Sequence, residues 1–238
     1  MPPSATTWHC GGPDPVSSDQ RVLHTPDPAE RENLATFLTH AIRLDPAAVV
    51  RMRRRGSSLV SAWVTTGFET LAVRTVTAEL GVDDVTVGAD SVLAGLGTGH
   101  PIDLGYSLDS AWRGALPPTD GFTHLDDVPA RTLVELAERG ADLAREHGGP
   151  HGPPPSLLDQ SVLTVTGAED LEVQVPMRVV FALTAMDFIP HAGEKVESHR
   201  IQPSELVRVR ATRTWLRLDA RYGSVARRLG GGIPLTPS

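Results

Sequence analysis

Residues 207–228 read VRVRATRTWLRLDARYGSVARR, and this stretch decides the fold class. Apolar and charged residues alternate along it, first as Val-Arg-Val-Arg and then as Leu-Arg-Leu-Asp. Strict alternation of this kind predicts β-strands with one buried and one exposed face. Gly223 marks a turn into a short third strand that ends in paired arginines. We therefore expect Val207, Val209, Leu216 and Leu218 to face the core.

A looser copy of this stretch lies earlier, at residues 50–74, with the sequence VRMRRRGSSLVSAWVTTGFETLAVR. A predicted helix precedes each copy, at residues 28–42 and 177–186. Asp27 is a natural N-cap for the first helix, and Pro28 suits the first helical position. The alternative is coincidence, because alternating Val and Arg is common in GC-rich coding sequences. The pattern predicts an α+β fold with antiparallel sheets, packed helices and duplicated helix-β-hairpin units.

Composition and turn signals divide the chain. Residues 1–27 are rich in Pro, Ser and Thr and are expected to form a disordered tail. Residues 28–121 and 122–229 are expected to form two α+β halves. Residues 230–238 follow as a short tail that begins with three glycines.

Composition and the single cysteine indicate the size of the core and the expected cellular location. The chain has 238 residues, of which 40% are hydrophobic, so it can bury a core of one or two domains. We find no apolar run near the roughly 20 residues of a membrane helix and no secretory signal. Cys10 is the single cysteine, which excludes an internal disulfide. We expect a cytoplasmic protein that does not contact membranes.

The segment LEVQVPMRVVFALTAM (171–186), followed by LVRVRATRTWLRLDARYGSV (206–225), places a strand, Val-Pro, a helix and a hairpin in succession. This order resembles the strand-helix-hairpin repeat of DNA sliding clamps, and residues 29–74 fit its helix-and-strands part. The resemblance implies a clamp-like fold and an association with DNA. Clamps line their hole with basic helices, whereas the arginines of this chain fall on strands. The overall texture, with Arg in place of Lys, resembles an uncharacterised family of actinobacterial proteins.

The distribution of arginine is the strongest functional signal. The net charge is −7, yet residues 200–228 carry eight arginines against two carboxylates, and residues 43–55 carry five against one. Alternation places these arginines on exposed sheet faces, where they could bind an anionic partner, either an acidic protein or a nucleic acid. An ordinary solvated face is the alternative. The expected binding arginines are Arg51, Arg53, Arg208, Arg210, Arg217 and Arg221.

The Gly- and Pro-rich loop region, residues 97–127, is the other candidate. Trp112 and Arg113 could form a recognition surface there, although a tryptophan can also fold back over the core. A small enzyme could instead use the ionisable residues of this region. The candidate catalytic side chains are His100, Asp103, Asp109 and His124.

Recognised chemical motifs give no further support for catalysis. We find no phosphate loop, dinucleotide fingerprint, nucleophile elbow or zinc signature, and we expect neither a metal nor a cofactor. We therefore expect a non-catalytic binding or scaffold protein with an arginine-rich sheet face, which could form a homodimer. Two alternatives stay open: the small enzyme, and a DNA-associated clamp-like protein.

Overall fold

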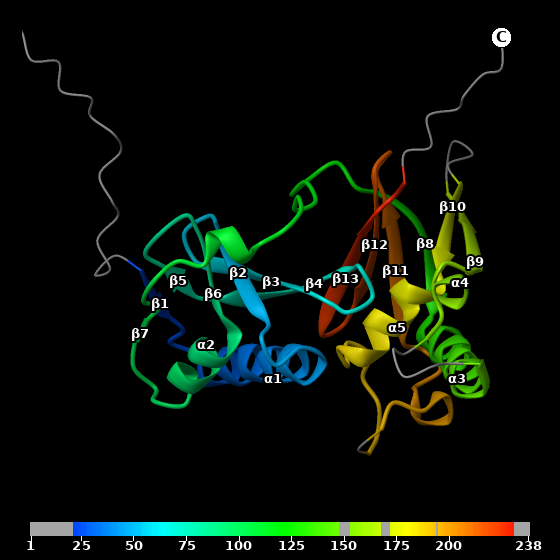
Figure 1. The fold of residues 1–238 in the computed structure, drawn as a ribbon, viewed down its shortest axis with the longest axis horizontal. Coiled ribbons are helices and arrows are strands. Elements are labelled where there is room, and N and C mark those ends of the chain that lie inside the picture. Colours follow the sequence, from blue (N-terminus) through cyan, green and yellow to red (C-terminus); the bar gives the residue numbers. More distant parts are fainter. Residues whose placement is uncertain (1–20, 148–152, 168–171, 194, 231–238) are drawn as a thin grey trace, which may run out of the picture.

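The computed structural model describes residues 21–147, 153–167, 172–193 and 195–230 (Figure 1). The expected tails, apart from residues 21–27 and 230, therefore lie outside the described residues. The helices are α1 (Pro28–Leu44), α2 (Ala89–Leu96), α3 (Ala130–His147), α4 (Pro155–Leu158) and α5 (Met177–Ala185), with 3₁₀ turns η2 (Asp109–Ala111) and η4 (Ser198–Arg200). The strands are β1 (Val22–His24), β2 (Val49–Arg55), β3 (Leu59–Thr65), β4 (Leu71–Thr77), β5 (Glu79–Leu80), β6 (Asp84–Gly88), β7 (Ile102–Asp103), β8 (Thr123–Pro129), β9 (Ser161–Thr166), β10 (Glu172–Pro176), β11 (Leu206–Ala211), β12 (Trp215–Ala220) and β13 (Gly223–Arg228).

One eight-stranded antiparallel sheet runs through both halves of the chain. Its strand order is β6-β2-β3-β4-β13-β12-β11-β8, so each half contributes four neighbouring strands. The remaining strands form a three-stranded sheet, β5-β1-β7, and a separate hairpin of β9 and β10. The fold class expected from the sequence, α+β with antiparallel sheets and packed helices, is confirmed.

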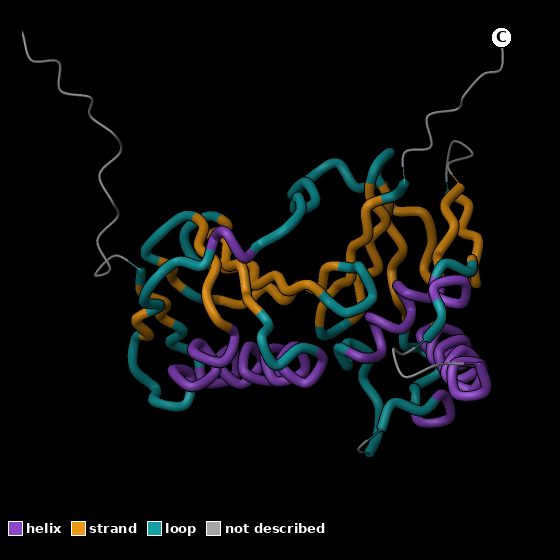
Figure 2. Tube along the Cα trace, in the orientation of Figure 1, coloured by secondary structure: helices purple, strands orange, loops and turns teal. Residues whose placement is uncertain are grey.

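The helices of both halves cover the same face of this sheet. α1 packs with α2 beside the strands of the first half, and α3 packs with α5 beside those of the second (Figures 1 and 2). Strand register explains this, because side chains on one face alternate with those on the other. Val207, Val209, Leu216 and Leu218 are 0% exposed, as expected, and they share the helix-covered face with buried residues of the first half, such as Val50 and Met52.

The duplicated unit is present twice, as α1-β2-β3-β4 and as α5-β11-β12-β13. The first copy begins where the sequence indicates, since the Asp27 side chain accepts a hydrogen bond from the Ala29 backbone at 2.9 Å. α1 extends two residues beyond the expected end, to Leu44. Residues 22–24, which we expected to belong to the tail, form β1, and Leu23 is fully buried.

The junction between the halves has a sheet part and a helix part. In the sheet, β4 and β13 pair through Val73 with Ser224, Ala72 with Val225 and Leu71 with Ala226. Beside the sheet, the guanidinium of Arg178 on α5 is 5% exposed and reaches back to the first half. It donates to the Phe68 carbonyl at 3.2 Å and to the Glu69 carboxylate at 2.7 Å.

Aromatic side chains complete the junction. Phe37 of α1 stacks on Phe188 with ring centroids 6.1 Å apart, and Phe68 packs on Phe181 at 5.9 Å. Each pair joins one residue of the first half to one of the second. The two halves therefore share a sheet, an ion pair and parts of one core.

Within the described residues, no helix is both long enough and apolar enough to span a lipid bilayer.

Gly223 shows how tightly this junction is packed. A Cβ atom at Gly223 would lie 2.5 Å from the Phe188 ring, whereas one at Gly67 would meet nothing within 4 Å. We predict that Gly223→Ala lowers the free energy of unfolding by about 1–3 kcal/mol, the usual cost of overpacking a core. Urea denaturation of both alanine variants measures the difference, with Gly67→Ala as the control. Equal effects from the two substitutions would show that the Phe188 ring moves freely.

His40 makes the junction sensitive to pH. Its Nε2 lies 3.7 Å from Asp187 Oδ2, and His191 Nε2 lies 2.8 Å from the other oxygen of the same carboxylate. Burial lowers the pKa of His40, the nearby Arg43 charge lowers it further, and Asp187 opposes the shift only in part. A lowered histidine pKa means that the fold favours the neutral ring. Its contribution to stability is therefore present above the unfolded pKa of about 6.5 and is lost as the pH falls below it.

We predict that His40→Gln reduces the loss of stability between about pH 7.5 and about pH 5.5, relative to the unmodified chain. Urea denaturation at the two pH values measures this loss. His199→Gln removes a histidine whose side chain is 73% exposed and serves as the control. An unchanged pH dependence in His40→Gln, or an equal change in both variants, would contradict the assignment.

Candidate anion-binding groove on the open sheet face

The face of the eight-stranded sheet opposite α1 and α5 is called here the open face. Strand register assigns alternate residues to it, because Arg51 lies opposite Trp63, Arg210 opposite Arg217, and Arg208 opposite Asp219. The pairing of β4 with β13 makes this face continuous across the two halves. Five of the expected arginines therefore share one face: Arg51, Arg53, Arg208, Arg210 and Arg217.

One carboxylate in each half holds two of these arginines. Asp84 accepts two hydrogen bonds from Arg51, at 2.8 and 2.7 Å, and lies 3.2 Å from Arg53 Nε. In the second half, Asp219 accepts a hydrogen bond from Arg217 at 2.5 Å and lies 3.4 Å from Arg210. The Asp84 hydrogen bonds raise the pKa of Arg51 despite its partial burial. The Asp219 group keeps one positive charge in excess, whereas Asp109 adds the charge of a second carboxylate near Arg51.

Two further pairs lie at the rim of the face. Arg208 Nε donates to Asp127 at 3.3 Å, and His124 contacts the same carboxyl oxygen at 3.0 Å. The His124 hydrogen bond, followed by Arg208, lowers the pKa of Asp127. Arg221 binds both oxygens of Glu205, at 2.6 to 3.2 Å, and this hydrogen bonding raises the arginine pKa.

Two arginines near the sheet junction form no ion pair with a carboxylate of the described residues. Arg55, at the end of β2, is exposed, and its side chain makes no hydrogen bond or ion pair with any described residue. Arg74 is only partly exposed; it donates to the Tyr222 carbonyl and lies 5.9 Å from the Tyr222 ring centroid. Burial lowers the pKa of Arg74, and the nearby charge of Glu30 opposes this shift only in part.

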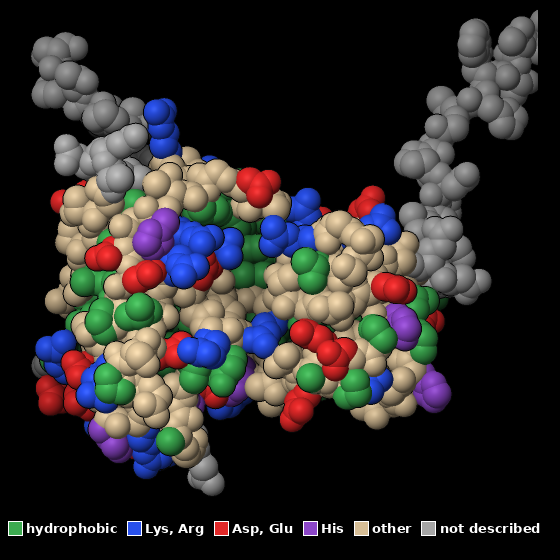
Figure 3. Space-filling view, turned by 180° about the vertical axis from the view of Figure 1, so that it is seen from behind, with side chains coloured by type: hydrophobic (Ala, Val, Ile, Leu, Met, Phe, Trp, Pro, Cys, Tyr) green, Lys and Arg blue, Asp and Glu red, His purple; other side chains and the backbone are tan. Residues whose placement is uncertain are grey.

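These arginines line a groove across the β4–β13 pairing. A hollow of about 310 Å³ is lined by Arg55, Arg74, Arg217 and Arg221. A second hollow, of about 60 Å³, lies next to it, because the two share Arg55, Ser61, Trp63 and Arg217. We call the two together the seam groove. Figure 3, seen from behind, shows Lys and Arg side chains gathered around a hollow near the middle of the molecule, with Asp and Glu beside them.

The loop residues Trp112 and Arg113 have different positions. Trp112 is 9% exposed, and the guanidinium of Arg51 lies over its ring at 5.9 Å. Its indole nitrogen donates to the Gly114 carbonyl at 3.1 Å. The ring therefore packs on Arg51 and offers little surface to a partner. Arg113 is exposed beside it.

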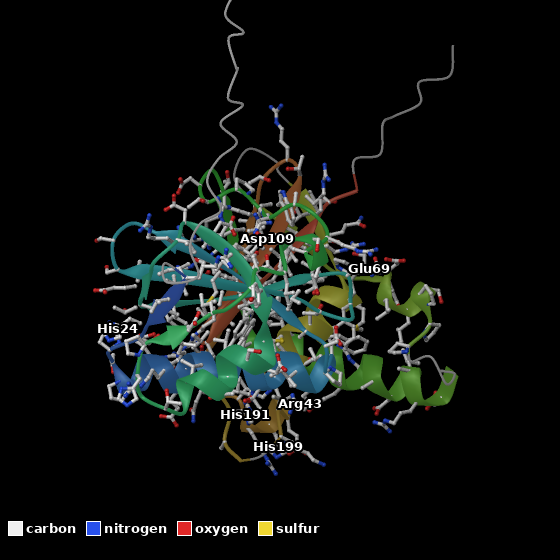
Figure 4. The ribbon with its side chains drawn as sticks, turned by 60° about the vertical axis from the view of Figure 1, so that its left-hand side comes forward. His24, Arg43, Glu69, Asp109, His191 and His199 are labelled. Atoms are coloured by element: carbon white, nitrogen blue, oxygen red, sulfur yellow. The ribbon has the colours of Figure 1, made fainter. Side chains whose placement is uncertain are left out.

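The four candidate catalytic residues are not brought together. No hydrogen bond or ion pair joins any two of His100, Asp103, Asp109 and His124 in the described part of the chain. Asp109 accepts from the Thr86 backbone at 2.9 Å, and Figure 4 shows it far from the helix-side residues Arg43 and His191. No group of three or more His, Cys, Asp or Glu residues with metal-binding geometry occurs among the described residues.

The pattern in the sequence missed two important residues. Trp63 lies on the open face opposite Arg51, and the alternation of β3 was the signal that could have placed it there. Arg74 could not be found in this way, because alternation in β4 assigns it to the helix-covered face. It lines the groove because it lies just beyond the end of the β4–β13 pairing, where it binds the Tyr222 carbonyl.

The arrangement defines a class of structure, in which two α+β halves share one sheet and carry their helices on one side. Two family models match the chain, Domain of unknown function (DUF8010) over residues 18–114 and Domain of unknown function (DUF8185) over residues 117–232. A search of curated proteins found no match.

Solved structures of bacterial sliding clamps have a similar fold. The DNA polymerase III beta of Caulobacter crescentus matches with a TM-score of 0.51 and 12% identity, over 90% of this chain and 66% of that protein. The sliding clamp of Pseudomonas aeruginosa bound to griselimycin matches with a TM-score of 0.52 and 13% identity, over 89% and 65%. The beta subunit of Streptococcus pyogenes matches at 0.51 and 11%, over 87% and 64%. The chain thus spans just under two thirds of the length of these clamps, and the resemblance seen in the sequence is confirmed for the fold.

Paired and unpaired arginines of the groove should differ in their effect on stability. Arg221→Ala leaves Glu205, whose side chain is 9% exposed, without its ion-pair partner, whereas Arg55→Ala removes no hydrogen bond or ion pair. An orphaned carboxylate loses the contacts that offset its desolvation. We predict a lower urea midpoint for Arg221→Ala and an unchanged midpoint for Arg55→Ala. A midpoint for Arg221→Ala equal to that of Arg55→Ala would contradict the pairing.

Proposed function

We propose that this protein is a non-catalytic binding scaffold and that its seam groove holds an anionic partner. The observation that carries the proposal is the excess of guanidinium groups over carboxylates along the groove. Asp84 and Asp219 are each shared by two arginines, and neither Arg55 nor Arg74 forms an ion pair with a described carboxylate. The local charge is thus positive although the chain as a whole carries −7.

The partial burial of Arg74 gives an energetic reason for the groove to bind an anion. A cation taken partly out of water is stable only when other groups replace its hydration. A carbonyl and the face of an aromatic ring do this in part for Arg74, and the groove leaves its open side to solvent. An anion bound there would complete the compensation, and Arg55 would add a second contact without first breaking an ion pair.

The charge on the helices favours the sheet face over a helix-lined channel. α1 and α3 together carry six acidic residues and five arginines. A surface with this balance does not attract a phosphate backbone strongly. The likeness to sliding clamps therefore supports a scaffold built on the same fold, with the anionic partner on the opposite face from the helices.

The test uses long-chain inorganic polyphosphate as a probe, since it carries charge without bases or peptide groups. We predict that the protein binds it, that the affinity falls steeply as salt rises, and that Arg55→Ala weakens binding and reduces the salt dependence. Fluorescence anisotropy with labelled polyphosphate at several salt concentrations measures both effects.

Arg139→Ala is the matched control, because Arg139 is exposed on α3 and, among the described residues, its side chain donates only to a backbone carbonyl. This variant changes the net charge by the same amount on the other side of the molecule. Equal weakening in the two variants would mean that binding follows net charge and not the groove. Absence of polyphosphate binding at low salt would refute the proposal altogether.

A further inference from the structure

We propose that the anionic partner of the seam groove is a single-stranded nucleic acid, whose phosphates bind the arginines and one of whose bases stacks on Trp63. This inference rests on the proposed function and goes beyond it by naming the chemical class of the partner. It is carried by an aromatic ring that lines the groove and makes no ring or cation contact with any residue that the structure describes.

Trp63 differs from the other tryptophans that the structure describes. Trp112 is 9% exposed and Trp215 is 7% exposed, and the indole nitrogen of Trp112 is hydrogen-bonded. Trp63 is half-buried and is absent from the residues that pack on the core, and its side chain makes no hydrogen bond, ring contact or cation contact within the described residues. Its neighbour across the strands, Arg51, lies over Trp112 instead.

Trp63 is positioned beside the cations of the groove. It lines both hollows together with Arg55 and Arg217. A half-buried tryptophan ring at the wall of a groove offers a flat apolar surface to a ligand, and aromatic rings are enriched at binding sites for this reason. The same two hollows are also lined by Arg53 and Arg221.

Cations beside an aromatic ring match the chemistry of a nucleic acid strand. Phosphates repeat along the backbone and the guanidinium fork binds them in a bidentate way, while every base offers a flat face for stacking. In a duplex the bases are stacked on one another and are not available to a side chain, so the partner must be single-stranded. An acidic peptide would use the arginines but would leave Trp63 uncovered.

The experiment compares three labelled probes of matched length with the full chain. The first is a single-stranded oligothymidylate, the second is an abasic strand with the same phosphates, and the third is an oligoglutamate peptide. We predict that the thymidylate strand binds about tenfold more tightly than the abasic strand, which is the gain expected from stacking one base. A duplex of the same length should bind no more tightly than the abasic strand.

Substitutions of Trp63 test whether this residue causes the tighter binding of the thymidylate strand. Trp63→Leu should abolish the preference for the thymidylate strand and leave the affinity for the abasic strand unchanged, whereas Trp63→Phe should keep part of the preference. Arg55→Ala should weaken both strands equally. If Trp63→Leu fails to fold, the affinities of the unmodified protein for the thymidylate and abasic probes still test base stacking.

The outcomes separate this inference from the proposed function. Equal affinity for the thymidylate and abasic strands would overturn base stacking while leaving an anion-binding groove. Tighter binding of oligoglutamate than of either strand would assign the groove to an acidic protein and overturn the inference. A preference for thymidylate that survives Trp63→Leu would place the base elsewhere. Failure of all three probes to bind would refute the groove and the proposed function together.

Discussion

The pairing of β4 with β13 is the constraint on which the rest of the structure depends. Three residue pairs join the strands and convert two four-stranded sheets into one. Without this pairing, the arginines of the two halves would have no common surface and the seam groove would have no floor. Arg178 reinforces it from the helix side, where a nearly buried guanidinium binds Glu69 and Asp159. Removing either carboxylate from such a site is costly, because a buried charge would lose its compensation.

Arginine-rich strands on an exposed sheet face create an electrostatic problem that this protein solves with few carboxylates. Like charges on neighbouring strands repel, and placing one acid between two arginines removes the repulsion while keeping the side chains ordered. Asp84 does this in the first half and Asp219 in the second. The arrangement orders the guanidinium groups in advance, so that a ligand need not immobilise them. Arg55 lies outside both groups and keeps its charge free of any described partner.

The sequence predicts the elements of this fold better than their association. Alternation assigned Val207 and Leu216 to the core, and the N-cap at Asp27 placed the start of α1, because both signals are local. The β4–β13 pairing joins residues about 150 positions apart and has no local signature. Gly223 shows what local signals miss. Its sequence context predicts a turn, whereas in the structure the absence of a Cβ atom leaves space for the Phe188 ring. The candidate site was predictable to the same extent. Alternation placed the arginines on one face, but it could not show that Arg51 lies over Trp112 and that the Trp63 ring has no cation contact among the described residues.

This chain resembles the sliding clamps in fold at only 11–13% sequence identity. The surfaces of the two kinds of protein can therefore differ in their chemistry. In each strand, every second residue faces the core and must be apolar. The residues between them face the solvent and can change without disturbing the core. In this chain those open positions carry arginines, shared carboxylates and a tryptophan, while the solvent faces of α1 and α3 carry nearly balanced charge. A fold that covers one face of a continuous sheet with helices thereby presents two surfaces that can change independently. The sheet face, being built from both halves, can carry a site that neither half contains alone.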